Sequence, residues 1–232
     1  MRTKLFCALD FDNADAARAL YRKLRPFHDH FKIGLELYTG AGPDFVRELA
    51  DDGARIFLDL KFHDIPNTVA GAVRQATRLG VGWVNIHLSG GKEMVEASRD
   101  AIAQSATTSG AKPVLLGVTV LTSMDDKSLR ETNVSLTASE QVLSLAKQGR
   151  DWGVDGVVCS ALELPQIRKT LPRDFVTVVP GIRPAGAASG DQSRVATPET
   201  AAKDGADFIV VGRPIYAAAD PVAAAKAILA SL

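Results

Sequence analysis

Eight short apolar segments recur along this chain, and amphipathic stretches separate them. This alternation limits the possible folds strongly, because strands that alternate with helices pack as a parallel sheet covered by those helices. The predicted helices include Asn13–Leu24, Pro43–Asp51, Pro66–Leu79, Lys92–Ser105 and Ala138–Trp152. The predicted strands are Leu5–Asp10, Phe31–Leu35, Arg55–Lys61, Trp83–Leu88, Pro113–Leu121, Gly156–Ser160, Phe175–Ile182 and Phe208–Gly212.

Eight is also the number of strands that closes a (β/α)8 barrel, and 232 residues suit a compact one. We predict an α/β protein with a single (β/α)8 TIM barrel over residues 1–232, because no linker or low-complexity segment divides the chain. The alternative is an open, doubly wound sheet, which is disfavoured because no G-x-G-x-x-G or Walker-type glycine loop is present. Several helices are expected to end at a glycine, namely Gly53, Gly80, Gly110, Gly153 and Gly205.

Charge and composition narrow the classes of partner. Lys+Arg and Asp+Glu both total 27, so the chain lacks the basic excess of a nucleic-acid-binding protein. No apolar stretch is long enough for a signal peptide or a membrane span, so we expect a cytoplasmic protein without a membrane partner. Cys7 and Cys159 lie in apolar strand segments and are expected to be buried free thiols. His28 and His30 are expected at the surface, and Trp83 and Trp152 at helix–strand junctions.

The third predicted strand ends in the run Asp59-Leu60-Lys61-Phe62-His63-Asp64-Ile65-Pro66-Asn67-Thr68. Side chains two apart on a strand share a face, so Asp59 and Lys61 are expected to point the same way. Asp64 follows three residues later. Two carboxylates that flank one lysine favour its charged form, which makes Lys61 a candidate proton donor.

Charged residues of alternating sign lie on three neighbouring strands, as Asp10, Lys32, Asp59 and Lys61. A single charge near a strand end is as often a solvated rim residue as a functional one. A buried alternating row, however, neutralises itself and orients each of its members. Chemistry in these barrels collects at the C-terminal ends of the strands, so we predict the active site there.

The ends of the seventh and eighth strands are suited to a phosphate group. Pro180-Gly181-Ile182-Arg183-Pro184 closes one strand, and Gly212-Arg213-Pro214-Ile215 closes the other. Loops at these two positions form the usual phosphate site of such barrels. Gly212 permits a close backbone approach, and Arg213 supplies several donors. The segment Ala185–Ser193, rich in Gly, Ala and Ser, is interpreted as a functional loop.

The runs Asp59–Thr68, Pro180–Pro184 and Gly212–Ile215, together with Asp191-Gln192, closely resemble the bacterial orotidine 5′-phosphate decarboxylases. The resemblance extends over essentially the whole chain. The Asp-x-Lys-x-x-Asp core also resembles related barrels that act on sugar phosphates. The Ile-Pro-Asn-Thr sequence that follows it and the set Arg183, Gln192 and Arg213 favour the nucleotide enzyme. The resemblance implies conversion of orotidine 5′-phosphate to UMP and carbon dioxide, the last step of de novo UMP synthesis. It implies neither a cofactor nor a metal.

The resemblance also implies a role for individual residues. Lys61 would protonate C6 of the pyrimidine, and Asp59 would lie against the substrate carboxylate. Lys32 would bridge Asp10 and Asp59 and, together with Asp10, meet the ribose hydroxyls. Thr122 would contact the base, and Ala185–Ser193 would close as a lid. The residues implied at the phosphate end of the substrate are Pro180, Arg183, Gln192, Gly212 and Arg213.

A homodimer is also implied, in which Asp64, Ile65 and Thr68 reach across a two-fold interface into the partner's site. Three other functions stay open. One is a magnesium-dependent sugar-phosphate decarboxylase or synthase. Another is a Schiff-base aldolase with Lys61 as nucleophile, which needs an uncharged lysine that Asp59 and Asp64 oppose. The last is a non-catalytic barrel that binds a phosphorylated ligand. His63 is expected to be structural or solvated, and His87, near the end of the fourth strand, is a candidate lining residue of the site.

Overall fold

The predicted alternation closes into a barrel. A computed structural model describes residues 2–105, 112–184 and 196–232. Within these residues, eight parallel strands pair in the order β1 to β8, and β8 pairs with β1 to close the ring. This result confirms the (β/α)8 barrel. The strands are β1 (Lys4–Ala8), β2 (His30–Gly34), β3 (Arg55–Phe62), β4 (Trp83–His87), β5 (Val114–Val118), β6 (Gly156–Val158), β7 (Val176–Val179) and β8 (Phe208–Val211).

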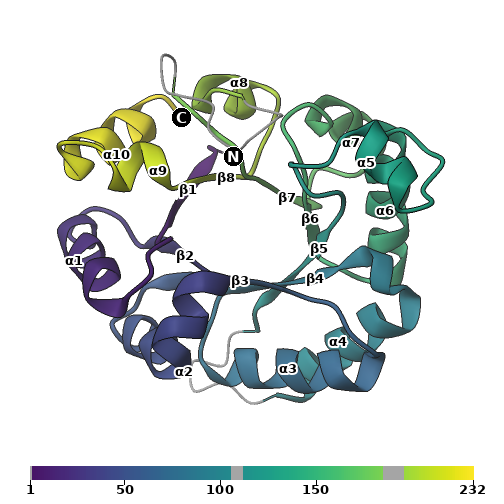
Figure 1. The fold of residues 1–232 in the computed structure, drawn as a ribbon, viewed down its shortest axis with the longest axis horizontal. Helices are drawn as coiled ribbons and strands as arrows, with labels where there is room; N and C mark the ends of the chain where they lie inside the picture. The colour runs from purple at the N-terminus through teal and green to yellow at the C-terminus, as the bar shows by residue number, and fades with distance from the viewer. Residues whose placement is uncertain (1, 106–111, 185–195) are drawn as a thin grey trace.

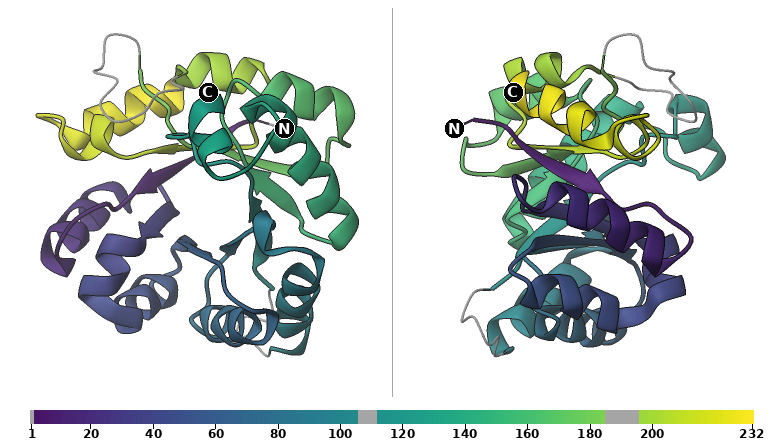
Figure 2. Two further views of the ribbon diagram at one scale, coloured as in Figure 1. Left: turned by 45° about the vertical axis from the view of Figure 1, so that its right-hand side comes forward. Right: turned by 90° about the vertical axis from the view of Figure 1, so that its left-hand side faces the viewer.

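The helices form a ring around the strands, and both termini lie near α8 in the view down the barrel (Figure 1). Figure 2 shows the same layers from the side. The helices of the described residues are α1 (Ala14–Leu24), α2 (Leu35–Asp51), α3 (Pro66–Arg78), α4 (Lys92–Gln104), α5 (Asp126–Glu131), α6 (Ala138–Trp152), α7 (Leu164–Thr170), α8 (Pro198–Lys203), α9 (Arg213–Tyr216) and α10 (Pro221–Ala230), with a 3-10 turn, η1, at Leu88–Gly90.

Local sequence explains where the helices begin. The Asn13 side chain accepts a hydrogen bond from the backbone of Ala16, and Thr137 and Glu140 form a capping box at the start of α6. The predicted helix Pro43–Asp51 is the second part of α2. The two parts meet at a kink, where Gly42 has a φ of 74° and Pro43 follows it. Gly110 lies outside the described residues, and the other four predicted helix-ending glycines have positive φ angles.

Alternate side chains of each strand divide into two cores. Leu5, Cys7 and Leu9 pack outward against the helices, whereas Phe6 and Ala8 face the barrel interior. The interior is filled by aromatic rings near the N-terminal ends of the strands. The ring centroid of Phe6 lies 4.7 Å from that of Phe208 and 4.9 Å from that of Trp83. The C-terminal half of the barrel therefore stands on a packed apolar floor.

Three sequence-based expectations are wrong, and they concern residues in or next to this floor. His28 and His30 are buried, at 8% and 7% exposure, instead of lying at the surface. The Nε2 atom of His28 donates to the His30 carbonyl at 2.7 Å, which compensates for burial of that ring. Trp83 packs inside the barrel and not at a helix–strand junction, because Val84 and not Trp83 faces the helices.

The expectations for the two cysteines and for Trp152 fit the structure. Both cysteines are buried, and burial, helped by the Asp10 charge, raises the pKa of Cys7 to about 12. Trp152 is partly buried and packs against the outer core. None of the helices in the described ranges is both long and apolar enough to cross a membrane.

The buried histidines should make stability depend on pH. Burial holds the pKa of both His28 and His30 below the ordinary value of 6.5, in His30 despite the Asp29 carboxylate beside it. The unfolded chain then binds protons that the folded chain does not, so acidification favours unfolding. We expect the free energy of unfolding to fall as the pH drops below about 6.5, as measured by urea titration between about pH 7.5 and 5.5.

A double variant, His28→Gln with His30→Phe, should show a shallower loss over this pH interval. His63 is exposed, so His63→Gln serves as the matched control and should keep the wild-type dependence. An equally steep loss in the double variant would show that other groups cause the effect.

Candidate active site

The structure brings the four alternating charges together at the C-terminal ends of β1, β2 and β3. The Lys32 Nζ atom lies 2.8 Å from Asp10 Oδ1 and 3.5 Å from Asp59 Oδ2. The Lys61 Nζ atom lies 2.7 Å from Asp59 Oδ1. All four side chains line one cavity of about 440 Å³. The expected common direction of Asp59 and Lys61 is therefore confirmed, while Leu60 between them packs outward.

The middle of this row is buried and its ends are open. The side chains of Lys32 and Asp59 are 9% and 13% exposed, whereas those of Lys61 and Asp10 are 30% and 43% exposed. Burial alone would lower the pKa of Lys32, but Asp59 and Asp10 outweigh it and hold that pKa above its ordinary value. Burial would raise the pKa of Asp59, but Lys32 and Lys61 hold it below its ordinary value. The two central groups therefore keep each other charged.

Strand β3 departs from regular geometry where it carries these charges. Leu58 pairs with Val84 and Phe62 with Ile86, so four steps along β3 face two steps along β4. This bulge contains Lys61, whose φ of 49° is in the left-handed region. Such a conformation costs a non-glycine residue about 1–2 kcal/mol. The bulge turns Lys61 toward the cavity beside Asp59.

Asn85 was not predicted from the sequence, although it contacts both members of this pair. Its Nδ2 atom donates to Asp59 Oδ1 at 2.7 Å, and its Oδ1 atom accepts from the Lys61 backbone at 2.8 Å. Asn85 is fully buried inside the barrel. An amide between Val84 and Ile86 in an apolar strand is a signal that could have found it, because such a group must find partners inside the fold.

The wall opposite the charged row comes from the ends of β5, β7 and β8. Thr122, Pro180, Arg183, Gly212 and Arg213 all line the same cavity, as the sequence predicted for a substrate site. Gln192 and the loop Ala185–Ser193 lie outside the described residues. The cavity thus has carboxylate and ammonium groups on one side and two guanidinium groups on the other. Lining residues that the sequence did not indicate include Glu36, Phe57, Val120, Cys159 and Tyr216.

Three predicted site residues lie outside this cavity in their own chain. Asp64 and Ile65, just before α3, and Thr68, in its first turn, are exposed, and Ile65 reaches 67% exposure. The Asp64 carboxylate accepts from the Ile65 backbone at 2.6 Å. His87 does not line the cavity either, and its ring centroid lies 5.3 Å from that of His63.

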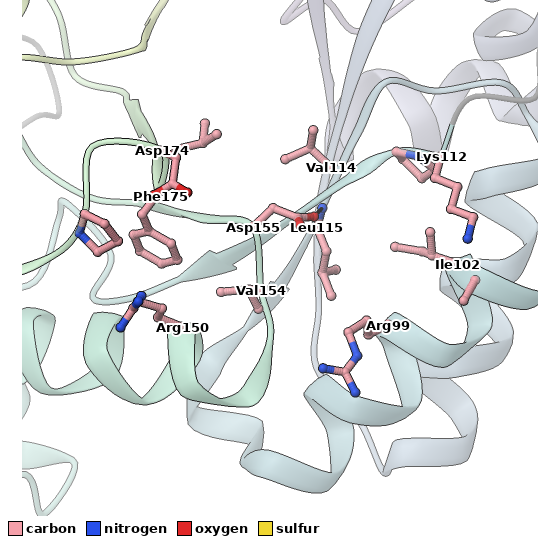
Figure 3. A pocket seen from close by; sticks show the side chains of 14 residues that line it. Arg99, Ile102, Lys112, Val114, Leu115, Arg150, Val154, Asp155, Asp174 and Phe175 are labelled. Atoms are coloured by element: carbon pink, nitrogen blue, oxygen red, sulfur yellow. Dashed lines mark hydrogen bonds between the residues drawn. The ribbon is translucent and has the colours of Figure 1, made fainter.

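A larger cavity, of about 590 Å³, lies at the opposite end of the barrel, where β5 and β7 begin (Figure 3). Arg99 of α4 and Arg150 of α6 project into it. The Asp155 carboxylate at this end accepts from the backbone of Leu115 at 2.7 Å and so fixes the start of β5. None of the charged row reaches this cavity, and in such barrels this end serves stability. The candidate active site is therefore the cavity at the C-terminal end.

Two carboxylates of the site, Asp10 and Asp59, have lysine partners. Asp10 pairs with Lys32, and Asp59 lies between Lys32 and Lys61. Across the described ranges, no cluster of three or more His, Cys, Asp or Glu side chains is arranged to hold a metal ion.

A closed (β/α)8 barrel with an ionised cavity at the C-terminal ends of its strands defines a barrel enzyme for a small anionic substrate. The chain belongs to the orotidine 5′-phosphate decarboxylase / HUMPS family, which its residues 3–228 match. It is 50% identical over 230 residues to the orotidine 5′-phosphate decarboxylase of Nitratidesulfovibrio vulgaris, covering 99% of this chain and 97% of that protein. The Moorella thermoacetica enzyme of the same name is 48% identical, over 100% of this chain and 92% of that one.

The fold comparison agrees with the sequence comparison. The crystal structure of orotidine 5′-phosphate decarboxylase from Lactobacillus acidophilus matches with a TM-score of 0.88 and 40% sequence identity. The match covers 100% of this chain and 99% of that chain. The family resemblance predicted from the sequence motifs is therefore confirmed.

Replacement of Lys32 should lower the free energy of unfolding. Lys32→Met leaves a buried Asp59 carboxylate with one ammonium neighbour instead of two. Breaking a buried ion pair destabilises proteins by about 3–5 kcal/mol, and we expect the lower end of this range because Lys61 remains. Urea denaturation would measure the change in the free energy of unfolding.

Two comparisons make this prediction specific. A double variant, Lys32→Met with Asp59→Asn, should be less destabilised than Lys32→Met alone, because the buried negative charge of Asp59 is removed together with its Lys32 partner. Lys92 pairs with Glu96 at 3.8 Å on the exposed face of α4, so Lys92→Met should change stability by less than about 1 kcal/mol. Equal losses in Lys32→Met and Lys92→Met would contradict the structural account.

Proposed function

We propose that this chain decarboxylates orotidine 5′-phosphate to UMP and carbon dioxide, the last step of UMP synthesis. The observation that carries the proposal is the cavity itself, in which the row Asp10, Lys32, Asp59 and Lys61 faces Arg183 and Arg213. Family membership and relatives of this name at 50% identity support the same reaction. Residues 1–232 would form one catalytic domain.

The proposed chemistry requires one proton and no redox partner. The bond between C6 and the carboxylate breaks, its electron pair stays on C6, and carbon dioxide leaves. Lys61 then gives a proton from its ammonium group to C6, and the resulting amine regains a proton from water. The overall reaction consumes orotidine 5′-phosphate and one proton. General acid catalysis of this kind typically contributes about 10²–10⁴-fold to the rate.

Asp59 contributes through its negative charge. It would lie against the substrate carboxylate, where two like charges crowd the bound ground state, and this crowding is relieved as carbon dioxide departs. The low pKa of Asp59, set by Lys32 and Lys61 against the effect of burial, keeps the carboxylate ionised at neutral pH. Lys32 and Asp10 would also meet the ribose hydroxyls from the open end of the row.

Binding of the phosphate would anchor the substrate far from the bond that breaks. Arg183 and Arg213 are the charged groups of the opposite wall, and Gly212 adjoins them. Arginine suits this role because its planar group can donate two parallel hydrogen bonds to phosphate oxygens. Binding energy from this remote group can orient the pyrimidine at Lys61. Thr122 would contact the base, and the proposed phosphate set also includes Pro180 and Gln192.

The proposal includes a homodimer. Asp64, Ile65 and Thr68 are exposed in the single chain and do not line its own cavity, which leaves them accessible to a second copy. These residues would reach across a two-fold interface into the partner's site. We place the protein in the cytoplasm, a reducing compartment in which the buried thiols Cys7 and Cys159 would persist.

A spectrophotometric assay of Lys61→Ala tests the proposal. Wild-type protein should remove the orotate absorbance of orotidine 5′-phosphate, also in the presence of EDTA. Lys61→Ala should lower kcat by on the order of 10²–10⁴-fold, because the proton donor is absent. Binding of UMP, measured by calorimetry, should be largely retained because Arg183 and Arg213, the proposed phosphate ligands, are unchanged.

Lys61→Arg is the matched control for charge. It keeps a cation beside Asp59 but does not release a proton readily, so it should be nearly as inactive as Lys61→Ala. Near-normal turnover in either variant would rule out the proton-donor role. Wild-type protein without decarboxylase activity would overturn the substrate assignment, and magnesium-dependent turnover of a sugar phosphate would then replace it.

Arg213→Ala tests the phosphate wall separately. Loss of a charge-assisted hydrogen bond weakens binding by about 1.5–3 kcal/mol, so kcat/KM should fall by about 10–100-fold, mostly through KM. Steady-state kinetics with orotidine 5′-phosphate would measure this change. Arg99→Ala, in the cavity at the other end of the barrel, is the control and should keep wild-type kinetics. An unchanged kcat/KM in Arg213→Ala would remove this residue from the phosphate site.

A further inference from the structure

We infer that Asn85 is a positioning residue that sets the geometry of the Asp59–Lys61 pair through both ends of its side-chain amide. The inference rests on the proposed function, because it assigns Asn85 an effect on proton donation by Lys61. Asn85 does not line the substrate cavity, so it acts through the two residues that do.

The orientation of the Asn85 amide is defined by its two partners. Nδ2 faces the Asp59 carboxylate, which can only accept, and Oδ1 faces the Lys61 backbone N–H, which can only donate. A rotated amide would place an acceptor against an acceptor and a donor against a donor. Asn85 is fully buried, and both hydrogen bonds go to the same short segment of β3. The group therefore serves this segment rather than the general packing of the barrel.

The segment needs such a partner because it has left the sheet ladder. Between Leu58 and Phe62, the bulge in β3 shifts the register with β4. A buried backbone N–H in a bulge must find another acceptor, and for Lys61 this acceptor is Asn85 Oδ1. The left-handed φ of 49° at Lys61 is thus held by a side chain of the neighbouring strand. In this conformation the Lys61 ammonium lies 2.7 Å from Asp59.

Asn85 also fixes the plane of the Asp59 carboxylate. Oδ1 of Asp59 receives two donors, Lys61 Nζ and Asn85 Nδ2, while its Oδ2 faces Lys32 at 3.5 Å. Without Asn85, the carboxylate is free to rotate toward Lys32 and away from Lys61. Both hydrogen bonds of the Asn85 side chain go to β3, whereas Arg183 and Arg213 follow β7 and β8 on the opposite wall of the cavity, so substrate binding should be spared.

Two variants separate this role from simple stability. Asn85→Ala removes both hydrogen bonds, and kcat should fall about 100-fold while KM changes less than about threefold, as for a catalytic group displaced by about 1 Å. Asn85→Asp is nearly isosteric and keeps an acceptor for Lys61, but it faces Asp59 with a carboxyl group. That group can donate only when protonated, so the activity of Asn85→Asp relative to wild type should rise as the pH is lowered. A purely structural residue would not produce this pH profile.

Thr119→Val is the matched control, because it also removes a buried hydrogen bond in the barrel, from Thr119 to the Val158 carbonyl at 2.9 Å. Thr119→Val should keep the wild-type kcat. Wild-type kcat in Asn85→Ala, or an Asn85→Asp profile parallel to wild type, would overturn the inference.

A crystal structure of Asn85→Ala, or of Asn85→Leu if the alanine variant does not fold, provides a readout independent of turnover. Lys61 should leave the left-handed region, and its Nζ should move away from Asp59. Retention of both features would overturn the inference. If wild-type protein fails to decarboxylate orotidine 5′-phosphate, the proposed function fails. The position of Lys61 in the crystal structure of the Asn85 variant would still show whether Asn85 positions Lys61.

Discussion

The ammonium group of Lys32 is buried on β2 between Asp10, which follows β1, and Asp59 on β3. The buried charges of Lys32 and Asp59 are unfavourable away from water unless groups of opposite charge lie beside them. Strands β1, β2 and β3 must therefore align before these buried charges are paired. Pairing of the three strands and assembly of the charged row are coupled for this reason. Gly34 follows Lys32 and leaves the necessary space, since a Cβ atom there would lie 3.0 Å from Lys32 Nζ.

Much of the fold could be predicted because its signals are local. The predicted helix Asn13–Leu24 corresponds to α1, and the predicted strand Leu5–Asp10 corresponds to β1, in which alternate residues pack in the inner and outer cores. The positions of His28, His30 and Trp83 were predicted wrongly. The polar ring atoms of the histidines suggest exposure, yet His30 and Trp83 pack among the aromatic rings at the base of the barrel, and His28 packs against Phe31. Which rings meet there depends on strands that are distant in the sequence, and no local period reveals it.

The candidate site was predictable to a similar extent. Its charged row follows from strand ends and parallel topology, so the sequence alone is enough to group Asp10, Lys32, Asp59 and Lys61. Asn85 could not be grouped with them, because its role depends on a bulge and a left-handed backbone in another strand. The exposed segment from Asp64 to Thr68 shows a different limit. A single chain does not contain the surface that this segment would meet in a dimer.

The aromatic floor of the barrel closes the cavity at the end that faces the N-terminal ends of the strands. Phe57 is both a lining residue of the cavity and a member of the packed interior, where its ring centroid lies 5.4 Å from that of Phe6. In the described part of the chain, packed aromatic side chains thus close the base of the cavity. Under the proposed function, the nucleotide and the proton that recharges Lys61 would therefore both enter from the C-terminal end of the barrel. A change that narrows this entrance would then slow substrate exchange and proton supply together.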